Sequence, residues 1–109
     1  MVPAVALVNQ APVIVSRTPA ADPITGLLVD DTDPIEFVVT DEDVATLTLT
    51  ATSSDSTIVS IDELDDSTLT VFLEGQSGGT ATITVTVTDA DGLSAVSYTH
   101  LTLPTIYSV

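Results

Sequence analysis

The sequence predicts an all-β protein folded as a sandwich of two sheets, and three observations lead to this prediction. First, apolar and polar residues alternate strictly in several segments, for example TLTLTAT at residues 46–52 and TATITVTVT at residues 80–88. Such alternation places successive side chains on opposite faces of a half-buried strand. Second, short clusters of Asp, Ser, Gly and Pro separate these segments, as turns require. Third, no window shows the spacing of an amphipathic helix.

Each element follows from this alternation. The outward positions are mostly Thr, whose β-branched and polar side chain suits the wet face of a sheet. The inward positions are Ile35, Phe37 and Val39, then Leu47, Leu49 and Ala51, then Leu69, Val71 and Leu73, then Ala81, Ile83, Val85 and Val87. In chain order we expect strands at residues 12–16, 35–40, 45–52, 57–61, 68–73 and 80–88 and from about 94, with an extra extended segment near 27–30. About seven such strands predict an immunoglobulin-like Greek-key β-sandwich.

Composition limits the partners that the protein can have. The chain has 109 residues, which is enough for one domain, and 44% of them are hydrophobic. Sixteen acidic residues face one cation, Arg17, so the formal net charge is −15. Nucleic acids and anionic membrane surfaces attract basic patches, so neither is expected as a partner. Cations are the natural counterpart of this charge.

Cysteine and hydropathy exclude further classes. The chain has no Cys, which excludes disulfides and thiolate metal sites but not export from the cell. No apolar run approaches the ~18 residues of a transmembrane helix, so membrane insertion is not expected. The opening MVPAVALV lacks the basic start and the cleavage site of a signal peptide. Residues 1–10 are therefore interpreted as a linker or as the end of a preceding unit in a longer protein.

Catalysis is not expected. Before residue 96 the sequence contains no His, no Cys and no Lys, so a Ser/His/Asp arrangement cannot be built there. Carboxylates are abundant, but they lie in turn sequences such as DED and DAD. The GQSGGT segment at residues 75–80 lacks the Lys of a phosphate-binding loop and no helix follows it. We interpret it as a turn between two strands.

The acidic residues carry the main functional signal. In a seven-strand Greek-key sandwich, three loops share one end of the domain. These loops would bring together Asp41, Glu42, Asp43, Asp62, Glu63, Asp65, Asp66, Asp89 and Asp91, with Asn9 and Gln10 entering beside them. Ca²⁺ takes six to eight oxygen ligands from such groups. The alternative is a solvated acidic rim that keeps the protein soluble. Asp30, Asp31 and Asp33 belong to the opposite end, where a turn explains them.

The last residues differ from the rest of the chain. Residues 96–105, VSYTHLTLPT, are similar to a translated transposase-type sequencing adapter. One reading frame of that adapter encodes these residues in order, and after a variable index it encodes Val and a stop codon, which matches Val109. The resemblance implies that native sequence ends near Ala95 and that residues 96–109 are non-native and occupy the last strand. Side chains with no expected function are then Tyr98, His100 and Tyr107.

The alternative is a natural last strand, AVSYTHLTL, with ordinary alternation. In either case the segment can complete the sandwich. We expect Val96, Tyr98, Leu101 and Leu103 to fill an apolar face.

Three segments resemble bacterial cadherin-like or immunoglobulin-like tandem repeats, which fill large surface and secreted adhesins. They are VNQAPVI at residues 8–14, DDTDPIEFVVTDEDVATLTLTATSS at 30–54 and GQSGGTATITVTVTDADGLSA at 75–95. In that family a Gly-Thr-Ala strand ends in an Asp-x-Asp-Gly turn. The resemblance makes residues 11–95 one repeat and covers about residues 8–95.

The resemblance also implies where calcium would bind. In cadherins the linker and one loop hold calcium between neighbouring domains, and the matching positions here are Asn9, Asp41 and Asp43. Asp89 and Asp91 lie beside them by the loop argument alone. The sequence departs from the family at Gln10, where cadherins have an acid, and it lacks their Asp-Arg-Glu motif.

These observations predict a non-catalytic repeat of a secreted or cell-surface bacterial protein. It would act as a structural or adhesive spacer, stiffened by Ca²⁺ at the junctions between repeats. Its partners would be neighbouring repeats of the same chain, together with host or cell-surface ligands. Two alternatives remain: a module that binds carbohydrate or protein directly, and an accessory domain of a secreted hydrolase.

Overall fold

The computed structural model describes residues 11–40 and 47–104. This part of the chain contains seven strands and no helix that could cross a membrane. The strands are β1 (Val13–Thr18), β2 (Thr32–Thr40), β3 (Thr48–Ser53), β4 (Val59–Asp65), β5 (Thr70–Gly75), β6 (Gly79–Thr88) and β7 (Ser94–Leu103).

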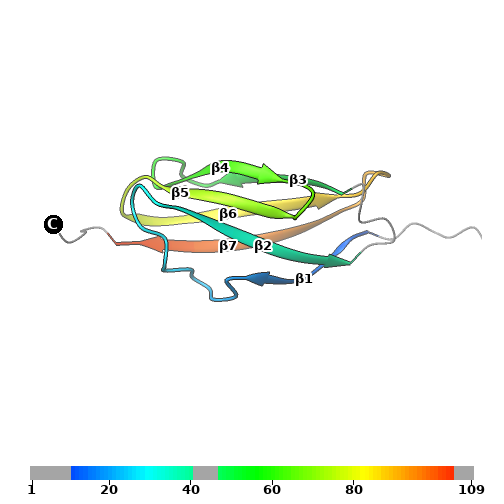
Figure 1. Cartoon of the computed structure of the whole chain (residues 1–109), viewed down its shortest axis with the longest axis horizontal. Coiled ribbons are helices and arrows are strands. Elements are labelled where there is room, and N and C mark those ends of the chain that lie inside the picture. The colour runs from blue at the N-terminus through cyan, green and yellow to red at the C-terminus, as the bar shows by residue number, and fades with distance from the viewer. Residues whose placement is uncertain (1–10, 41–46, 105–109) are drawn as a thin grey trace, which may run out of the picture.

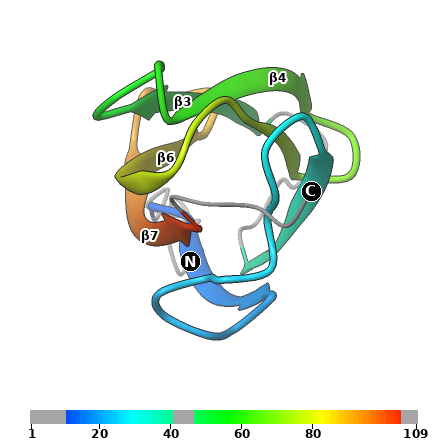
Figure 2. The same ribbon diagram turned by 90° about the vertical axis from the view of Figure 1, so that its left-hand side faces the viewer.

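The strands form a four-stranded sheet in the order β1-β2-β5-β4 and a three-stranded sheet in the order β3-β6-β7. All strand pairs are antiparallel. Figures 1 and 2 show the two sheets packed face to face. This order is that of the immunoglobulin constant-type sandwich. The predicted all-β sandwich of seven strands is confirmed.

The core lies between the sheets and follows the alternation of the sequence. In β6, Ala81, Ile83, Val85 and Val87 are all buried, and the intervening Thr residues face outward. The neighbouring strands contribute the same alternation because their register with β6 is regular along the whole length. The rest of the core consists of Ile24, Leu27, Ile35, Phe37, Val39, Leu47, Leu49, Val59, Leu69, Val71, Leu73, Leu101 and Leu103.

Some predicted boundaries were wrong. The sequence predicts that Asp62 and Glu63 lie in a loop, but β4 continues through Asp65, so both residues lie in a strand. This strand lies at the edge of its sheet and pairs only with β5. Exposed acidic side chains are common on such edge strands, because they discourage pairing with another chain. The extended segment near 27–30 is not a strand, and only Val29 forms an isolated bridge, to Gly75.

The last strand, β7, fills the expected place but shows a different face to the core. Leu101 and Leu103 are buried as expected, whereas Val96 and Tyr98 are 46% and 63% exposed. The prediction that all four share one face was wrong. Val96 and Tyr98 are an odd number of residues from Leu101 and Leu103, and a strand with a period of two therefore places them on opposite faces.

The residues of β7 that do face the core in its first half are small or polar. Ala95, Ser97 and Thr99 lie opposite Val87, Val85 and Ile83 of β6. Thr99 is fully buried, and in the described part of the chain its Oγ1 is the buried side-chain atom with no hydrogen-bond partner. A buried hydroxyl without a partner destabilises the folded state.

The segment between β1 and β2 packs directly on β5 through Gly75. The Gly75 N–H donates to the Asp31 carbonyl (3.0 Å), and the Asp30 N–H donates to the Gly75 carbonyl (2.8 Å). A Cβ added at Gly75 would overlap the backbone carbonyl of Leu28. Glycine is therefore required here by close approach of two backbones.

We expect Thr99→Val to stabilise the protein by about 1 kcal/mol, because it removes an unpaired buried hydroxyl and keeps the side-chain shape. This would raise the thermal midpoint by about 4–8 °C, measured by circular dichroism. The control is Thr52→Val on the exposed face of β3, which should change stability by less than about 0.5 kcal/mol. If Thr99→Val is no more stable than the parent, the Thr99 hydroxyl is not an unpaired buried group that destabilises the folded state.

We expect Gly75→Ala to destabilise the protein by about 1–3 kcal/mol, because the added methyl group forces the Leu28 backbone away from β5. Gly26→Ala is the matched control, since an added Cβ at Gly26 meets no atom within 4 Å. Denaturant unfolding of both variants compares them directly. Equal effects at the two positions would show that the contact at Gly75 is not tight.

Candidate functional site

Two of the predicted metal ligands, Asp89 and Asp91, lie at one end of the sandwich, which we call the entry end. Here Val13 of β1 pairs with Thr40 of β2, and the β4–β5 and β6–β7 turns lie nearby (Figure 1). Of the predicted ligands, Asp89 and Asp91 lie in the β6–β7 turn. The other three, Asn9, Asp41 and Asp43, lie outside the described residues.

Asp89 organises the β6–β7 turn. Its side chain is 8% exposed, and Oδ1 accepts hydrogen bonds from the backbone N–H groups of Asp91 and Leu93, both at 2.9 Å. Its backbone N–H donates to the Leu93 carbonyl (2.8 Å), and its carbonyl accepts from the Gly92 N–H (3.1 Å). Gly92 has φ +88°, a conformation that glycine adopts without strain. Asp91 is exposed.

A second carboxylate organises the β4–β5 turn. Asp65 Oδ1 accepts from the Ser67 hydroxyl (2.7 Å), the Ser67 N–H (3.0 Å) and the Thr68 N–H (3.4 Å). The hydrogen bond from the Ser67 side chain is the largest of the causes that lower the pKa of Asp65. These bonds favour the charged carboxylate. The turn ends at Leu69, which is buried with φ +52°.

A third carboxylate connects the two sheets. Asp66 Oδ1 accepts a hydrogen bond from the backbone N–H of Leu49 in β3 (3.0 Å). Asp66 follows β4, which belongs to the other sheet. This hydrogen bond gives the Leu49 N–H, which lies on the edge of β3, an acceptor. It also holds the β4–β5 turn against β3.

Three acids at the entry end, Asp65, Asp66 and Asp89, therefore have structural contacts of their own. In the described residues, no group of three or more His, Cys, Asp or Glu side chains is placed to hold a metal. Carboxylate oxygens are the ligands that Ca²⁺ prefers, so the residue types at this end fit the ion. The two N–H groups on Asp89 Oδ1 compete with a cation for that oxygen. The calcium site built on Asn9, Asp41, Asp43, Asp89 and Asp91 stays a prediction.

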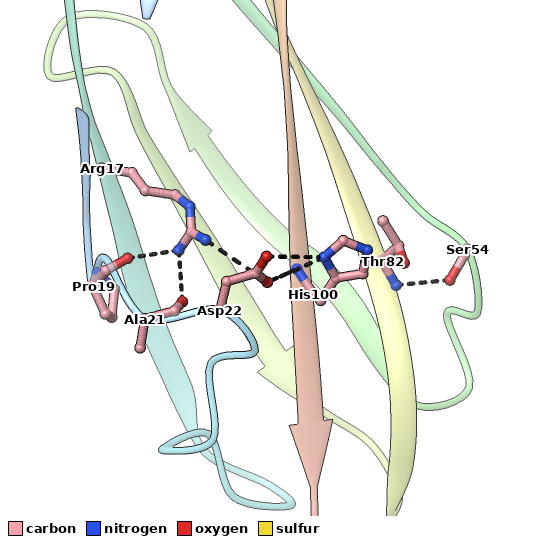
Figure 3. Close-up of polar contacts among 7 residues, drawn as sticks. All are labelled: Arg17, Pro19, Ala21, Asp22, Ser54, Thr82 and His100. Atoms are coloured by element: carbon pink, nitrogen blue, oxygen red, sulfur yellow. Dashed lines mark hydrogen bonds and ion pairs between the residues drawn. The ribbon is translucent and has the colours of Figure 1, made fainter. Parts of the chain in front are cut away.

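A second polar cluster lies at the opposite end, which we call the exit end because β7 finishes there. A groove of about 390 Å³ crosses β6 and β7 between Asp22 and Ser54. His100 Nδ1 lies 3.1 Å from Asp22 Oδ1, and Arg17 Nη2 lies 3.9 Å from the same oxygen. Figure 3 shows Asp22 between Arg17 and His100. Arg17 also donates to the carbonyls of Pro19 (2.7 Å) and Ala21 (3.1 Å).

Sequence reasoning missed this cluster. Asp22 and His100 are 78 positions apart, and no local pattern relates them. The backbone N–H of His100 also donates to Asp22 Oδ1 (3.3 Å). The contacts of Asp22 therefore join the β1–β2 connection to β7 by side chain and backbone together.

The groove contains Ser, His and Asp, but not in a catalytic arrangement. Ser54 Oγ accepts a hydrogen bond from the Thr82 N–H (2.8 Å). Within the described part of the chain, no hydrogen bond connects Ser54 to His100. Nucleophilic catalysis requires that contact between the hydroxyl and the base. The observed contacts hold segments together.

Comparison with known proteins gives the fold. Neither the scan against family models nor the search of curated proteins found a match. Among solved structures, domains 4 and 5 of the S-layer protein SbsC are similar, with a TM-score of 0.62, 12% identity and 89% of this chain covered. A nucleoside hydrolase-related hypothetical protein from Saccharophagus degradans, described as associated with carbohydrate metabolism, matches with a TM-score of 0.64, 20% identity and 87% coverage.

Both similarities involve only part of the other protein. The match covers 53% of the SbsC chain and 26% of the Saccharophagus chain. At these identities the comparisons establish a shared β-sandwich fold.

We expect Asp89→Ala to destabilise the protein by about 2 kcal/mol, because two backbone N–H groups lose their charged acceptor. Asp91→Ala, in the same turn but with an exposed side chain, should change stability by less than about 0.5 kcal/mol. Unfolding of both variants is measured in chelator, so that metal binding does not contribute. Equal losses for the two variants would contradict the role of Asp89 in the turn.

Proposed function

We propose that the chain is a structural repeat of a secreted or cell-surface protein, whose task is to hold other domains apart. The observation that carries this proposal is the placement of the two ends of the described fold. Val13 begins β1 at the entry end, and Leu103, paired with Gly79, finishes β7 at the exit end (Figure 1). Strands of ten residues such as β6 span about 33 Å. Copies joined end to end would extend rather than fold back.

The similarity to domains 4 and 5 of an S-layer protein supports this proposal. That structure contains two domains, and the match covers 53% of its chain. Neighbouring domains of the same chain are accordingly the first partners that we propose. Repeat proteins of this kind gain stability from such neighbour contacts.

We further propose that calcium stiffens the junctions between repeats. The net charge of −15 makes two neighbouring repeats repel each other, and a divalent cation between them would reverse that repulsion. The ligands would come from Asn9, Asp41, Asp43, Asp89 and Asp91. Oxygen donors of this type suit Ca²⁺.

The test uses two copies of residues 11–103 joined by residues 1–10. Small-angle scattering should give a maximum dimension close to twice that of one copy, and side-by-side packing would contradict a spacer. A thermal melt with calcium and with chelator then tests the metal. Calcium at a hundred times its dissociation constant adds about 2.7 kcal/mol.

Asp41→Asn with Asp43→Asn should abolish the calcium-dependent rise in the midpoint. Asp62→Asn with Glu63→Gln removes the same charge from exposed positions of β4 and should leave the rise intact. If both double variants respond to calcium like the parent, the site lies elsewhere. If sodium at equal ionic strength raises the thermal midpoint as much as calcium does, the effect is charge screening and not binding of calcium at a specific site.

An accessory role beside a secreted hydrolase is the second candidate. The similarity to a protein described as associated with carbohydrate metabolism favours it. Binding of the isolated chain to a glycan array distinguishes this role from that of a spacer, which should give no signal.

A further inference from the structure

An apolar pocket of about 200 Å³ lies at the exit end, between the β1–β2 connection and the two sheets. Its walls include Leu27 of the connection, Ile35 of β2, Leu73 of β5 and Leu101 of β7. These four side chains are only 1–2% exposed, so the pocket reaches into the core. In the part of the chain that the structure describes, the charged side chain that lines it is the exposed Asp33. We call this cavity the exit-end pocket.

An empty apolar cavity of this size destabilises a core. Protein interiors pack as densely as organic crystals, and apolar atoms that face a void lose their dispersion contacts on that side. A cavity of about 150 Å³ lined by Leu, Ile and Phe takes up benzene. The exit-end pocket is therefore large enough for one aromatic ring.

The chain leaves β7 beside this pocket. Ile24 forms a parallel bridge with Leu101. Its N–H donates to the His100 carbonyl (2.8 Å), and its carbonyl accepts from the Thr102 N–H (3.0 Å). Because the bridge is parallel, the β1–β2 connection and the end of β7 run side by side in the same direction. Figure 2 looks onto this end, where the connection forms one side of the sandwich. The uncharged residues 105–109, TIYSV, continue from here.

We propose that Tyr107 fills the exit-end pocket and that its phenol hydroxyl donates a hydrogen bond to the Asp33 carboxylate. Leu101 and Leu103 face the core, and a strand period of two puts Tyr107 on the same side. The three residues beyond Pro104 can extend up to about 10 Å, which is also about the spacing of two packed sheets. The segment can therefore cross from β7 to the pocket wall on β2.

Tyr107 fits the exit-end pocket better than a free apolar molecule or a neighbouring chain does. A short tether holds a side chain near its site at an effective concentration in the millimolar range. A buried tyrosine hydroxyl needs a hydrogen-bond partner, and within the described residues the Asp33 carboxylate has no hydrogen bond. Ile106 falls on the opposite face by the same period. The contact depends on the side chain alone and not on the origin of the segment.

Benzene binding tests whether the pocket is occupied. The probe is benzene alone, followed through the NMR shifts of the Leu27 and Leu101 methyl groups. The parent should not bind it, because its pocket is filled, whereas Tyr107→Ala empties the pocket and should bind it. Tyr98→Ala removes a tyrosine that is 63% exposed and should behave like the parent. Benzene that binds the parent as strongly as Tyr107→Ala, or that binds neither, would overturn the proposal.

Acrylamide quenching of tyrosine fluorescence tests the same contact with conservative variants. The chain has no Trp and two Tyr residues. Tyr98→Phe leaves Tyr107 as the emitter, and Tyr107→Phe leaves the exposed Tyr98 as the reference. Tyr107 should be quenched severalfold less than Tyr98, because the pocket walls exclude the quencher. Equal quenching of the two tyrosines would show that Tyr107 lies in solvent and would overturn the proposal.

A double-mutant cycle tests the hydrogen bond to Asp33. Tyr107→Phe should raise the unfolding equilibrium constant about fivefold through loss of this bond, and it should have no such effect in the Asp33→Ala background. Tyr98→Phe is the matched control and should leave the constant unchanged. Denaturant unfolding of the parent and the variants measures these constants. Equal effects of Tyr107→Phe in both backgrounds would overturn the pairing of Tyr107 with Asp33.

Discussion

The alternation of β6 is the constraint on which the rest of the sandwich depends. Its inward residues from Ala81 to Val87 are buried at 4% exposure or less, and the strand pairs with β3 on one side and β7 on the other. A slip of one residue in either pairing would turn every core side chain of the neighbouring strand to solvent. The register of the three-stranded sheet is therefore fixed by the core, and the turns at its ends must adapt to it.

The adaptation of the turns explains how the acids at the entry end are used. Asp65, Asp66 and Asp89 each accept backbone hydrogen bonds that a turn or an edge would otherwise leave unpaired. A carboxylate can accept several such bonds while staying charged. The same residues thus contribute to folding and to the large negative charge. Any cation at this end would act on turns that are already ordered.

The strand β7 shows how a sheet can accept an imperfect sequence. Its backbone pairs with β6 over ten residues, and Leu101 and Leu103 fill the core at the exit end. Toward the entry end Ser97 and Thr99 occupy core positions, and Thr99 leaves a hydroxyl without a partner. Backbone hydrogen bonds do not depend on side-chain identity, so the ladder forms although the packing is poor. The unpaired hydroxyl of Thr99 lowers the stability of the folded state.

The sequence alone determined the fold class and the inward faces of β2, β3, β5 and β6, because a period of two leaves one consistent assignment for a half-buried strand. It could not determine that β4 extends through Asp65, since acids favour turns locally and only pairing with β5 makes them a strand. Tertiary structure alone decided the contact of Asp22 with His100, the reach of Asp66 to Leu49 and the exposure of Tyr98. These depend on which strands lie side by side, and local spacing carries no information on contacts between segments distant in the chain.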